Sequence, residues 1–140
     1  MAIEIRPFRV TDTDDLVEIL KLNGQYDYPE VEGPGAMKRV SECPAAVFLV
    51  AEEAARPVGL IRGIYDGARA LIHLLSVHPD HQHQGTGRAL VAAISAEFRR
   101  RGSSGTTVTV SESSARFWEK IGFTQLPVFL MLTSFDARNP

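Results

Sequence analysis

Three β-strand patterns follow one another along the middle of the chain, and the connections between them are only a few residues long. The segments AAVFLVAEE (45–53), PVGLIRGIYD (57–66) and ARALIHLLSV (68–77) are rich in apolar residues and separated by turn-forming residues. Such short connections favour antiparallel neighbours, since a parallel pair needs a crossover of a dozen residues or more. Pro79 prevents simple continuation of the third strand. The centre of the fold is therefore predicted to be an antiparallel meander.

The pattern changes to a helical one after this meander. Leu90, Ile94 and Phe98 recur every four residues and predict an amphipathic helix over 86–101, which ends at Gly102 after three arginines. The other expected elements begin with a strand at 3–8, a helix capped by Thr11 or Thr13 and stopped by Gly24, a loop at 25–35 and a short helix at 35–42. After the long helix we expect a strand at 105–111, a helix at 113–121, and two last strands at Phe123 and 128–135. This order predicts an α/β (α+β) domain with a largely antiparallel sheet.

Length and composition exclude several classes of protein. The chain has 140 residues, which predicts a single domain over 1–140. No apolar run reaches the roughly 20 residues of a membrane span, and the N-terminus does not resemble a signal peptide. We therefore predict a cytoplasmic protein with no membrane partner. With 15 basic and 17 acidic residues, no nucleic-acid partner is expected from charge. The single cysteine excludes an intramolecular disulfide.

A glycine-rich turn separates the third meander strand from the long helix. Within His78–Arg88, Gly85 and Gly87 lie where the first amides of the helix lack an internal acceptor. Glycines there let a bulky anion such as a pyrophosphate approach the backbone. A tight turn that binds no ligand is the alternative explanation. His78, His81 and His83 form an H-x-x-H-x-H pattern that could hold zinc, but no cysteine or carboxylate completes a familiar spacing, so we expect no metal.

Two motifs resemble those of the GNAT N-acetyltransferase superfamily. Gln82-x-x-Gly85-x-Gly87, after LLSVHPD, is similar to the acyl-coenzyme-A-binding signature of that family. The segment Ser111-Glu-Ser-Ser114-Ala-Arg-Phe117-Trp118-Glu-Lys-Ile-Gly122-Phe123 looks like the family's helix that ends in Gly-Phe. The predicted order of helices and strands is also the family's, so that the resemblance covers nearly the whole chain.

The resemblance implies a mixed sheet of six to seven strands, with about four helices and a splayed parallel pair formed by strands near 71–77 and 106–111. It implies that acetyl-CoA is the co-substrate, with its pantetheine arm in that gap and its pyrophosphate on the amides of 83–88. The cofactor-binding residues carried over are Leu75, Ser76, Val77, Gln82, His83, Gln84, Gly85, Thr86, Gly87, Arg88, Ser111, Ser114, Phe117 and Trp118. The family also makes a homodimer a reasonable expectation.

The implied reaction is direct attack of a primary amine on the thioester in a ternary complex, with a small-molecule or peptide amine as acceptor. A lysine-like amine with a pKa of about 10.4 must lose a proton, so a base is useful. His73, on a mostly apolar strand, is the candidate base, and a histidine that only packs on the sheet is the alternative. Tyr26, Tyr28 and Glu30 are candidate substrate residues on the acidic loop, which is otherwise a polar surface loop.

One position departs from the family pattern. Trp118 stands where the family usually has a tyrosine that protonates the leaving thiolate, and an indole N–H cannot transfer a proton near neutral pH. A non-catalytic acyl-CoA-binding protein is therefore the first alternative function. A small phosphate- or metal-binding domain unrelated to acyl transfer is the second.

Overall fold

The computed structural model describes residues 2–135, which form two compact units. The first unit ends at Val108 and the second begins at Thr109. Each unit is described by itself below. A single functional domain over 1–140 stays a prediction.

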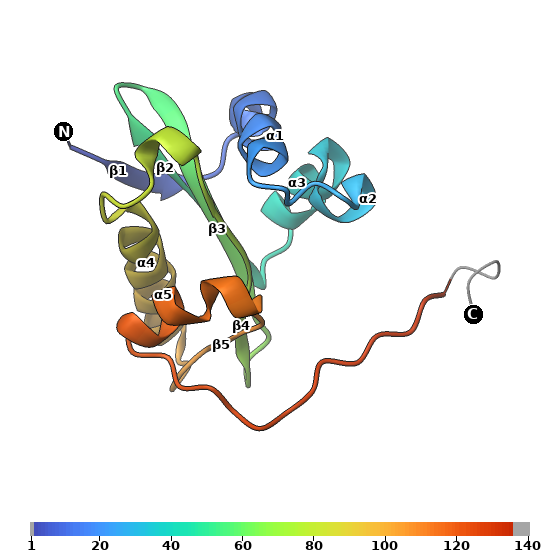
Figure 1. Ribbon diagram of the computed structural model, residues 1–140. Helices are drawn as coiled ribbons and strands as arrows, with labels where there is room; N and C mark the ends of the chain where they lie inside the picture. The colour runs from blue at the N-terminus through green and yellow to red at the C-terminus, as the bar shows by residue number, and fades with distance from the viewer. Residues whose placement is uncertain (1, 136–140) are drawn as a thin grey trace. The chain divides into compact units, whose positions relative to one another are not determined.

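A five-stranded sheet forms the centre of the first unit (Figure 1). Its strands follow the chain order: β1 (Glu4–Pro7), β2 (Ala46–Glu53), β3 (Arg56–Tyr65), β4 (Ala70–Val77) and β5 (Thr107–Val108). The first three pairings are antiparallel, and β4 pairs with β5 in parallel. The predicted meander is therefore confirmed, and the sheet is mixed.

Helices lie on both sides of this sheet (Figure 1). One side carries α1 (Thr13–Leu22), α2 (Pro29–Glu32) and α3 (Pro34–Ser41), and the other carries α4 (Thr86–Arg101). The bounds of α4 are those predicted, and α2 lies in the segment expected to be a loop. Apart from the four-residue α2, the described residues form four α-helices, which include α5 of the second unit. The predicted GNAT-like α/β architecture agrees with this arrangement.

Apolar side chains of α1, α3 and α4 pack against the sheet. Leu16, Ile19 and Leu20 of α1 form a buried cluster with Met37 of α3 and with Phe48, Val50 and Leu60 of the sheet. On the other side, Leu90, Ile94 and Phe98 of α4 are buried, as their spacing of four residues predicts. Burial of these two faces fixes where β3 and β4 lie between the layers.

The start of α1 differs from the expected threonine cap. Its N-cap is Asp12, and Thr13 Oγ1 instead donates a hydrogen bond to the carbonyl oxygen of Val10. Asp12 is buried and accepts two hydrogen bonds from Arg6, at 2.8 and 2.9 Å. The backbone N–H of Arg9 adds a third bond at 2.7 Å. An aspartate that neutralises a buried arginine therefore occupies the position assigned to a threonine.

The second unit contains one 3₁₀ turn (Glu112–Ser114) and α5 (Ala115–Lys120). The prediction of six to seven strands was wrong, because the described residues form five. The strand expected over 105–111 is reduced to β5, and the segment 128–135 forms no strand. A β-rich sequence becomes a strand only beside a backbone that pairs with it. The apolar side chains Val128, Phe129, Leu130, Met131 and Leu132 are accordingly 73–94% exposed.

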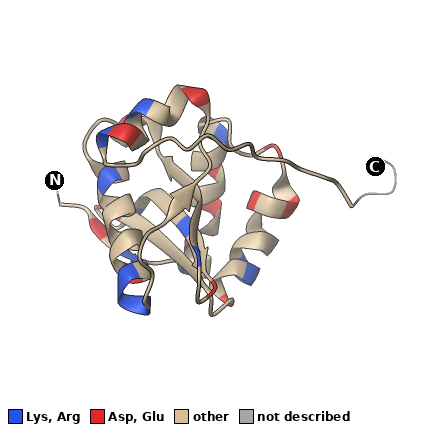
Figure 2. Cartoon of the chain, turned by 90° about the horizontal axis from the view of Figure 1, so that it is seen from below, with Lys and Arg blue, Asp and Glu red and all other residues tan. Residues whose placement is uncertain are grey.

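The distribution of charged and apolar residues over the helices agrees with what the composition predicts. Basic and acidic segments are interspersed along the helices (Figure 2), as the near balance of 15 basic and 17 acidic residues leads one to expect. Among residues 2–135, no helix is long and apolar enough to cross a membrane.

Candidate functional site

Strand β4 has an open edge along its second half. β5 pairs only with Leu71 and Ile72, so from His73 to Val77 no other strand in the described part of the chain continues the sheet on that side. The parallel pairing of β4 with β5 covers two residues of each strand, and the splaying of this pair stays a prediction. An unpaired strand edge offers backbone N–H and C=O groups to a ligand.

Side-chain amides bond to two carbonyl groups of this strand. The Leu75 carbonyl accepts a hydrogen bond from Gln25 Nε2 at 3.1 Å. The Val77 carbonyl accepts one from Asn23 Nδ2 at 2.8 Å and one from Gln82 Nε2 at 2.9 Å. Sequence reasoning missed Asn23 and Gln25, because a polar residue after a helix has many uses. Gln82, the first residue of the glycine motif, joins the turn to the end of β4.

The hydroxyl group of Ser76 completes this network on the inner side. Ser76 is buried and its Oγ accepts a hydrogen bond from Asn23 Nδ2 at 2.7 Å. Asn23 Oδ1 in turn accepts one from Gln82 Nε2 at 3.2 Å. The end of α1 is thereby bound to the end of β4, so the predicted positions Leu75, Ser76, Val77 and Gln82 are brought together.

A β-bulge sets the position of His73. Arg62 of β3 lies opposite Leu74, and Gly63 lies opposite Ile72, so His73 has no residue opposite it. A bulge of this kind re-aims a side chain and increases the local twist. The candidate base His73 thus lies at the bulge in the β3–β4 pairing, one residue after the last residue of β4 that pairs with β5.

Gly63 permits this bulge. A Cβ atom at Gly63 would lie 2.2 Å from the Leu71 carbonyl oxygen and 3.1 Å from Ile72 Cα. Backbone approach this close excludes a side chain, which is a usual reason for glycine inside a strand. The sequence carried this signal, but the interpretation of 57–66 as a regular strand did not use it.

The surroundings of His73 favour its neutral form. Desolvation lowers its pKa below the usual 6.5, and the positive charge of Arg62 lowers it further. The imidazole is therefore mostly deprotonated at neutral pH, which is the state that a general base needs.

The glycine-rich turn brings together the residues predicted to bind an anion. His83 has a φ of +62° and Gly85 a φ of +85°, and α4 begins at the next residue, Thr86. The first helical bond joins the Ala89 N–H to the Gly85 carbonyl. The amides of Thr86, Gly87 and Arg88 therefore have no helical acceptor. Gly85 has open space where a Cβ would project.

Thr86 adds a second polar group to this turn. Its side chain is buried, and Thr86 Oγ1 has no hydrogen-bond partner among the described residues. Buried hydroxyl groups are normally bonded, so this hydroxyl is an exception among the described residues. Amides without acceptors, a positive-φ glycine and a free hydroxyl suit an anionic group such as a pyrophosphate.

The histidines of the turn have other neighbours. His81 Nδ1 lies 2.8 Å from Glu53 Oε2, and His78 Nδ1 accepts the Asp80 N–H at 3.1 Å. Among residues 2–135, no group of three or more histidine, cysteine or acidic side chains is arranged to hold a metal ion. His78 and His81 of the H-x-x-H-x-H pattern therefore make local contacts within the described residues.

The candidate substrate residues lie in α2 and in the segment just before it. Tyr26 is half-buried and packs against the cluster around Leu16, whereas Tyr28 and Glu30 are exposed. This segment reaches the sheet through Arg62, whose Nη2 donates a hydrogen bond to the Val31 carbonyl at 2.6 Å. The segment proposed to bind the substrate thus contacts β3, the strand that pairs with the bulged strand β4.

The remaining predicted residues belong to the second unit. Ser111 and Ser114 are hydrogen-bonded through their hydroxyl oxygens at 3.1 Å. The Trp118 ring packs edge-on against Phe117 at 5.3 Å and against Phe123 at 5.1 Å between ring centroids. Trp118 is thus part of an aromatic cluster that stabilises the Gly-Phe end of α5.

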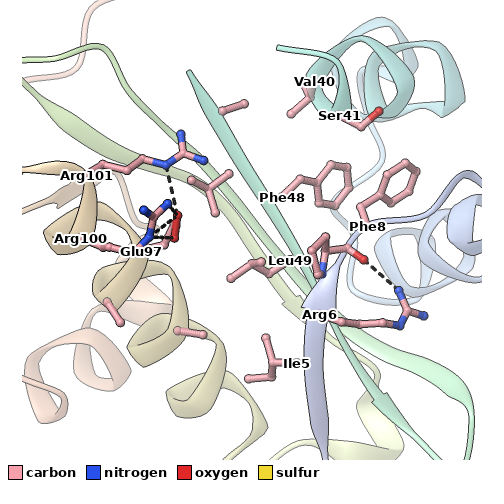
Figure 3. A pocket seen from close by; sticks show the side chains of 15 residues that line it. Ile5, Arg6, Phe8, Val40, Ser41, Phe48, Leu49, Glu97, Arg100 and Arg101 are labelled. Atoms are coloured by element: carbon pink, nitrogen blue, oxygen red, sulfur yellow. Dashed lines mark hydrogen bonds and ion pairs between the residues drawn. The ribbon is translucent and has the colours of Figure 1, made fainter. Parts of the chain in front are cut away.

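A cavity of about 540 Å³ lies at the opposite edge of the sheet (Figure 3). Phe8 and Phe48 stack at 4.3 Å on one side of it, and Glu97 contacts Arg100 and Arg101 on the α4 side. None of the predicted site residues lines this cavity. This cavity therefore lies away from the bulge and the glycine turn.

Comparison with known proteins decides the family. Residues 44–125, more than half of the chain, match the family model described as an acetyltransferase (GNAT) domain. This chain belongs to the GNAT acetyltransferase family. An acetyltransferase of Photorhabdus laumondii is 33% identical over 116 residues, which cover 80% of this chain and 78% of the relative. The family and its curated relatives identify this GNAT protein as an acyl-CoA-dependent acetyltransferase.

Solved structures agree with the GNAT fold. The PaiA N-acetyltransferase of Thermoplasma acidophilum, solved in complex with coenzyme A, superposes with a TM-score of 0.78 at 19% identity, over 92% of this chain and 94% of that one. AAC(6')-Iy in complex with the bisubstrate analogue CoA-S-monomethyl-acetylneamine gives a TM-score of 0.81 at 12% identity, over 96% and 99%.

Proposed function

We propose that this GNAT enzyme transfers the acetyl group of acetyl-CoA directly to a primary amine. The observation that carries the proposal is the continuity of the open β4 edge with the glycine-rich turn. A long, polar ligand with an anionic end would lie along 73–77 and place that end at the start of α4. Both halves of the site come from one strand and the helix that follows it. The CoA complex of the Thermoplasma neighbour supports the choice of ligand.

The pyrophosphate is assigned to the turn of residues 82–88. The amides of Thr86, Gly87 and Arg88 supply donors, and the positive end of α4 favours negative charge. Thr86 Oγ1 provides a further donor. Gln82 acts by holding the turn against Val77 rather than by touching the ligand. The pantetheine arm is assigned to the edge of β4 that no strand pairs with. Val77 is its main-chain contact through the backbone N–H, since the Val77 carbonyl already accepts hydrogen bonds from Asn23 and Gln82.

His73 is assigned the role of general base. Its lowered pKa keeps the imidazole neutral, so that the ring can take a proton from the acceptor ammonium directly or through water. The amine nitrogen forms the bond to the acetyl carbon while the carbon–sulfur bond breaks, and the thiolate leaves. The second proton that the nitrogen loses passes through water to the thiolate. Because a thiol has a pKa of about 8.5, protonation by water suffices once the thiolate has left. Trp118 is then no obstacle to turnover.

Calorimetric titration with acetyl-CoA, with ATP as the control ligand, tests the assignment of the turn. We expect saturable binding of acetyl-CoA that is clearly tighter than binding of ATP. Gly85→Val should abolish it, because a bulky side chain would fill the open space at the turn. Gly67→Val is the matched control, since Gly67 also has a positive φ and open space but lies in the β3–β4 turn.

A folded Gly85→Val protein with unchanged affinity would refute the phosphate assignment. If acetyl-CoA binds, release of free thiol in the presence of an amine panel then tests acetyl transfer. Binding without thiol release for any amine would refute the proposed reaction and favour a binding protein instead.

A further inference from the structure

Residues 2–135 include two buried arginines, and only one of these two forms an ion pair within that part of the chain. Arg6 of β1 is 8% exposed and contacts the carboxylates of Asp12 and Glu52 at 2.8 and 3.1 Å. Arg62 of β3 is 7% exposed, yet no carboxylate of residues 2–135 lies within ion-pair distance of it. Its one hydrogen bond goes to the Val31 carbonyl. Arg6 and Arg62 are therefore buried to a similar extent, but Arg6 contacts carboxylates whereas Arg62 contacts a backbone carbonyl.

An unpaired buried guanidinium is costly. The group carries five N–H donors and stays charged, and removing a charge from water is costly. Among the described residues no nitrogen of Arg62 is both fully buried and without a partner, so its unbonded N–H groups keep some contact with the surface. Glu32 acts on Arg62 through Coulomb attraction only, since its Oε2 accepts the Tyr28 N–H at 3.1 Å. Desolvation outweighs that attraction and lowers the pKa of Arg62. The fold thus leaves the guanidinium short of negative charge.

Arg62 lies next to the proposed reaction centre. It is opposite Leu74 across the β3–β4 pairing, one residue beyond the bulge at His73. Neighbouring strands are about 4.8 Å apart, so an acceptor beside His73 is within reach of Arg62. The short α2 supplies the Val31 carbonyl that binds Arg62, and it carries Glu30, one of the candidate substrate residues.

We propose that Arg62 binds a carboxylate of the acceptor, so that the acceptor is an amino acid or another amine that carries a carboxylate. This inference rests on the proposed acetyl transfer and names its substrate class. A carboxylate accepts two parallel hydrogen bonds from a guanidinium, which supplies both the missing charge and the missing acceptors. The amine end of the same molecule faces His73.

The test compares free amino acids with their carboxamides as acceptors. Each pair has the same amine and side chain and differs only in the carboxylate. We expect wild-type kcat/KM to be at least about tenfold higher for the acid, mostly through KM, because the carboxamide leaves the buried charge unpaired. In Arg62→Gln the ratio of acid to amide should fall to near one. Arg62→Lys, which keeps the charge without the planar fork, should give an intermediate ratio.

Arg69→Gln is the matched control, because Arg69 is an exposed arginine in the turn just before β4. It should keep the wild-type ratio. Thermal unfolding and affinity for acetyl-CoA establish that each variant is folded. A wild-type ratio near one, or a ratio that survives in folded Arg62→Gln, would overturn the assignment and leave Arg62 a structural link to α2.

Binding measurements separate this inference from the proposed reaction. If acetyl-CoA binds but no amine is acetylated, the reaction fails, and calorimetry of the same acid and amide pairs with the coenzyme A complex still decides the acceptor. Binding of acids but not amides, lost in Arg62→Gln, would support the inference. Binding of neither or of both alike would overturn it.

Discussion

Replacing Gly63 by alanine tests whether the bulge at His73 depends on close backbone approach. The new Cβ would lie 2.2 Å from the Leu71 carbonyl oxygen and 3.1 Å from Ile72 Cα. Ordinary van der Waals contacts begin at 3.4 Å, so β3 and β4 must separate by about 1 Å at this point. Both neighbours are backbone atoms in a paired strand and cannot move independently.

The cost follows from that forced separation. Overpacking a fitted interior costs typically about 1–3 kcal/mol, and a clash with backbone belongs at the upper end of the range. At about 3–4 °C per kcal/mol for a chain of this size, Gly63→Ala should lower the unfolding midpoint by about 10 °C. Rearrangement of the bulge also moves His73, so acetyl transfer should fall more than affinity for acetyl-CoA.

Gly59→Ala provides the matched control on the same strand. Its Cβ would lie 3.1 Å from the Ser76 carbonyl oxygen and 3.2 Å from Leu90 Cδ1, so shifts of a few tenths of an ångström suffice. We expect a loss of about 1 kcal/mol and little effect on turnover. Thermal unfolding and thiol release measured on both variants check that Gly63→Ala loses more stability and more activity than Gly59→Ala. Equal stability and activity of the two would refute the reasoning.

Three further predictions follow from single contacts. His73→Ala should lower the plateau rate about 100-fold or more and remove the acid limb of the pH profile, with acetyl-CoA affinity kept, whereas an unchanged profile would exclude His73 as the base. Asp12→Asn should cost about 3 kcal/mol in urea unfolding at pH 7, because it leaves Arg6 buried with weaker pairing. Burial opposes ionisation of Asp12, yet its hydrogen bonds from Arg6 and Arg9 hold its pKa below the usual value. The difference should therefore be complete above about pH 4 and shrink only as the pH falls through that lowered pKa, and equal differences at pH 7 and pH 2 would contradict it. If the expected homodimer buries the exposed segment 128–132, replacing Phe129 and Leu132 by serine should halve the mass in sedimentation, and a monomeric wild type would reject it.

Local patterns explain why the meander and α4 were predictable. Apolar residues at every fourth position and a glycine stop define α4 without reference to the rest of the chain, and short turns force the antiparallel order of β2 to β4. The bulge was not predictable in this way, since a shift of one residue leaves the composition of a strand unchanged. The lack of a counter-ion at Arg62 depends on which distant acids fold toward it. Segment 128–135 has strand composition, but composition does not supply a neighbouring backbone with which it can pair.

If Arg62 binds the carboxylate of the acceptor, the pKa of His73 should change when the acceptor binds, and pH profiles can measure this change. In the free enzyme the positive charge of Arg62 helps to lower the pKa of His73. A bound carboxylate offsets that charge, so the pKa of His73 should rise in the complex. The acid limb of kcat, which reports the complex, should then lie at higher pH than the limb of kcat/KM, which reports the free enzyme. With a carboxamide acceptor, or in Arg62→Gln, this separation should disappear. Coincident limbs for a carboxylate acceptor would show that the substrate leaves Arg62 unpaired, and the electrostatic link between the two residues would have to be abandoned.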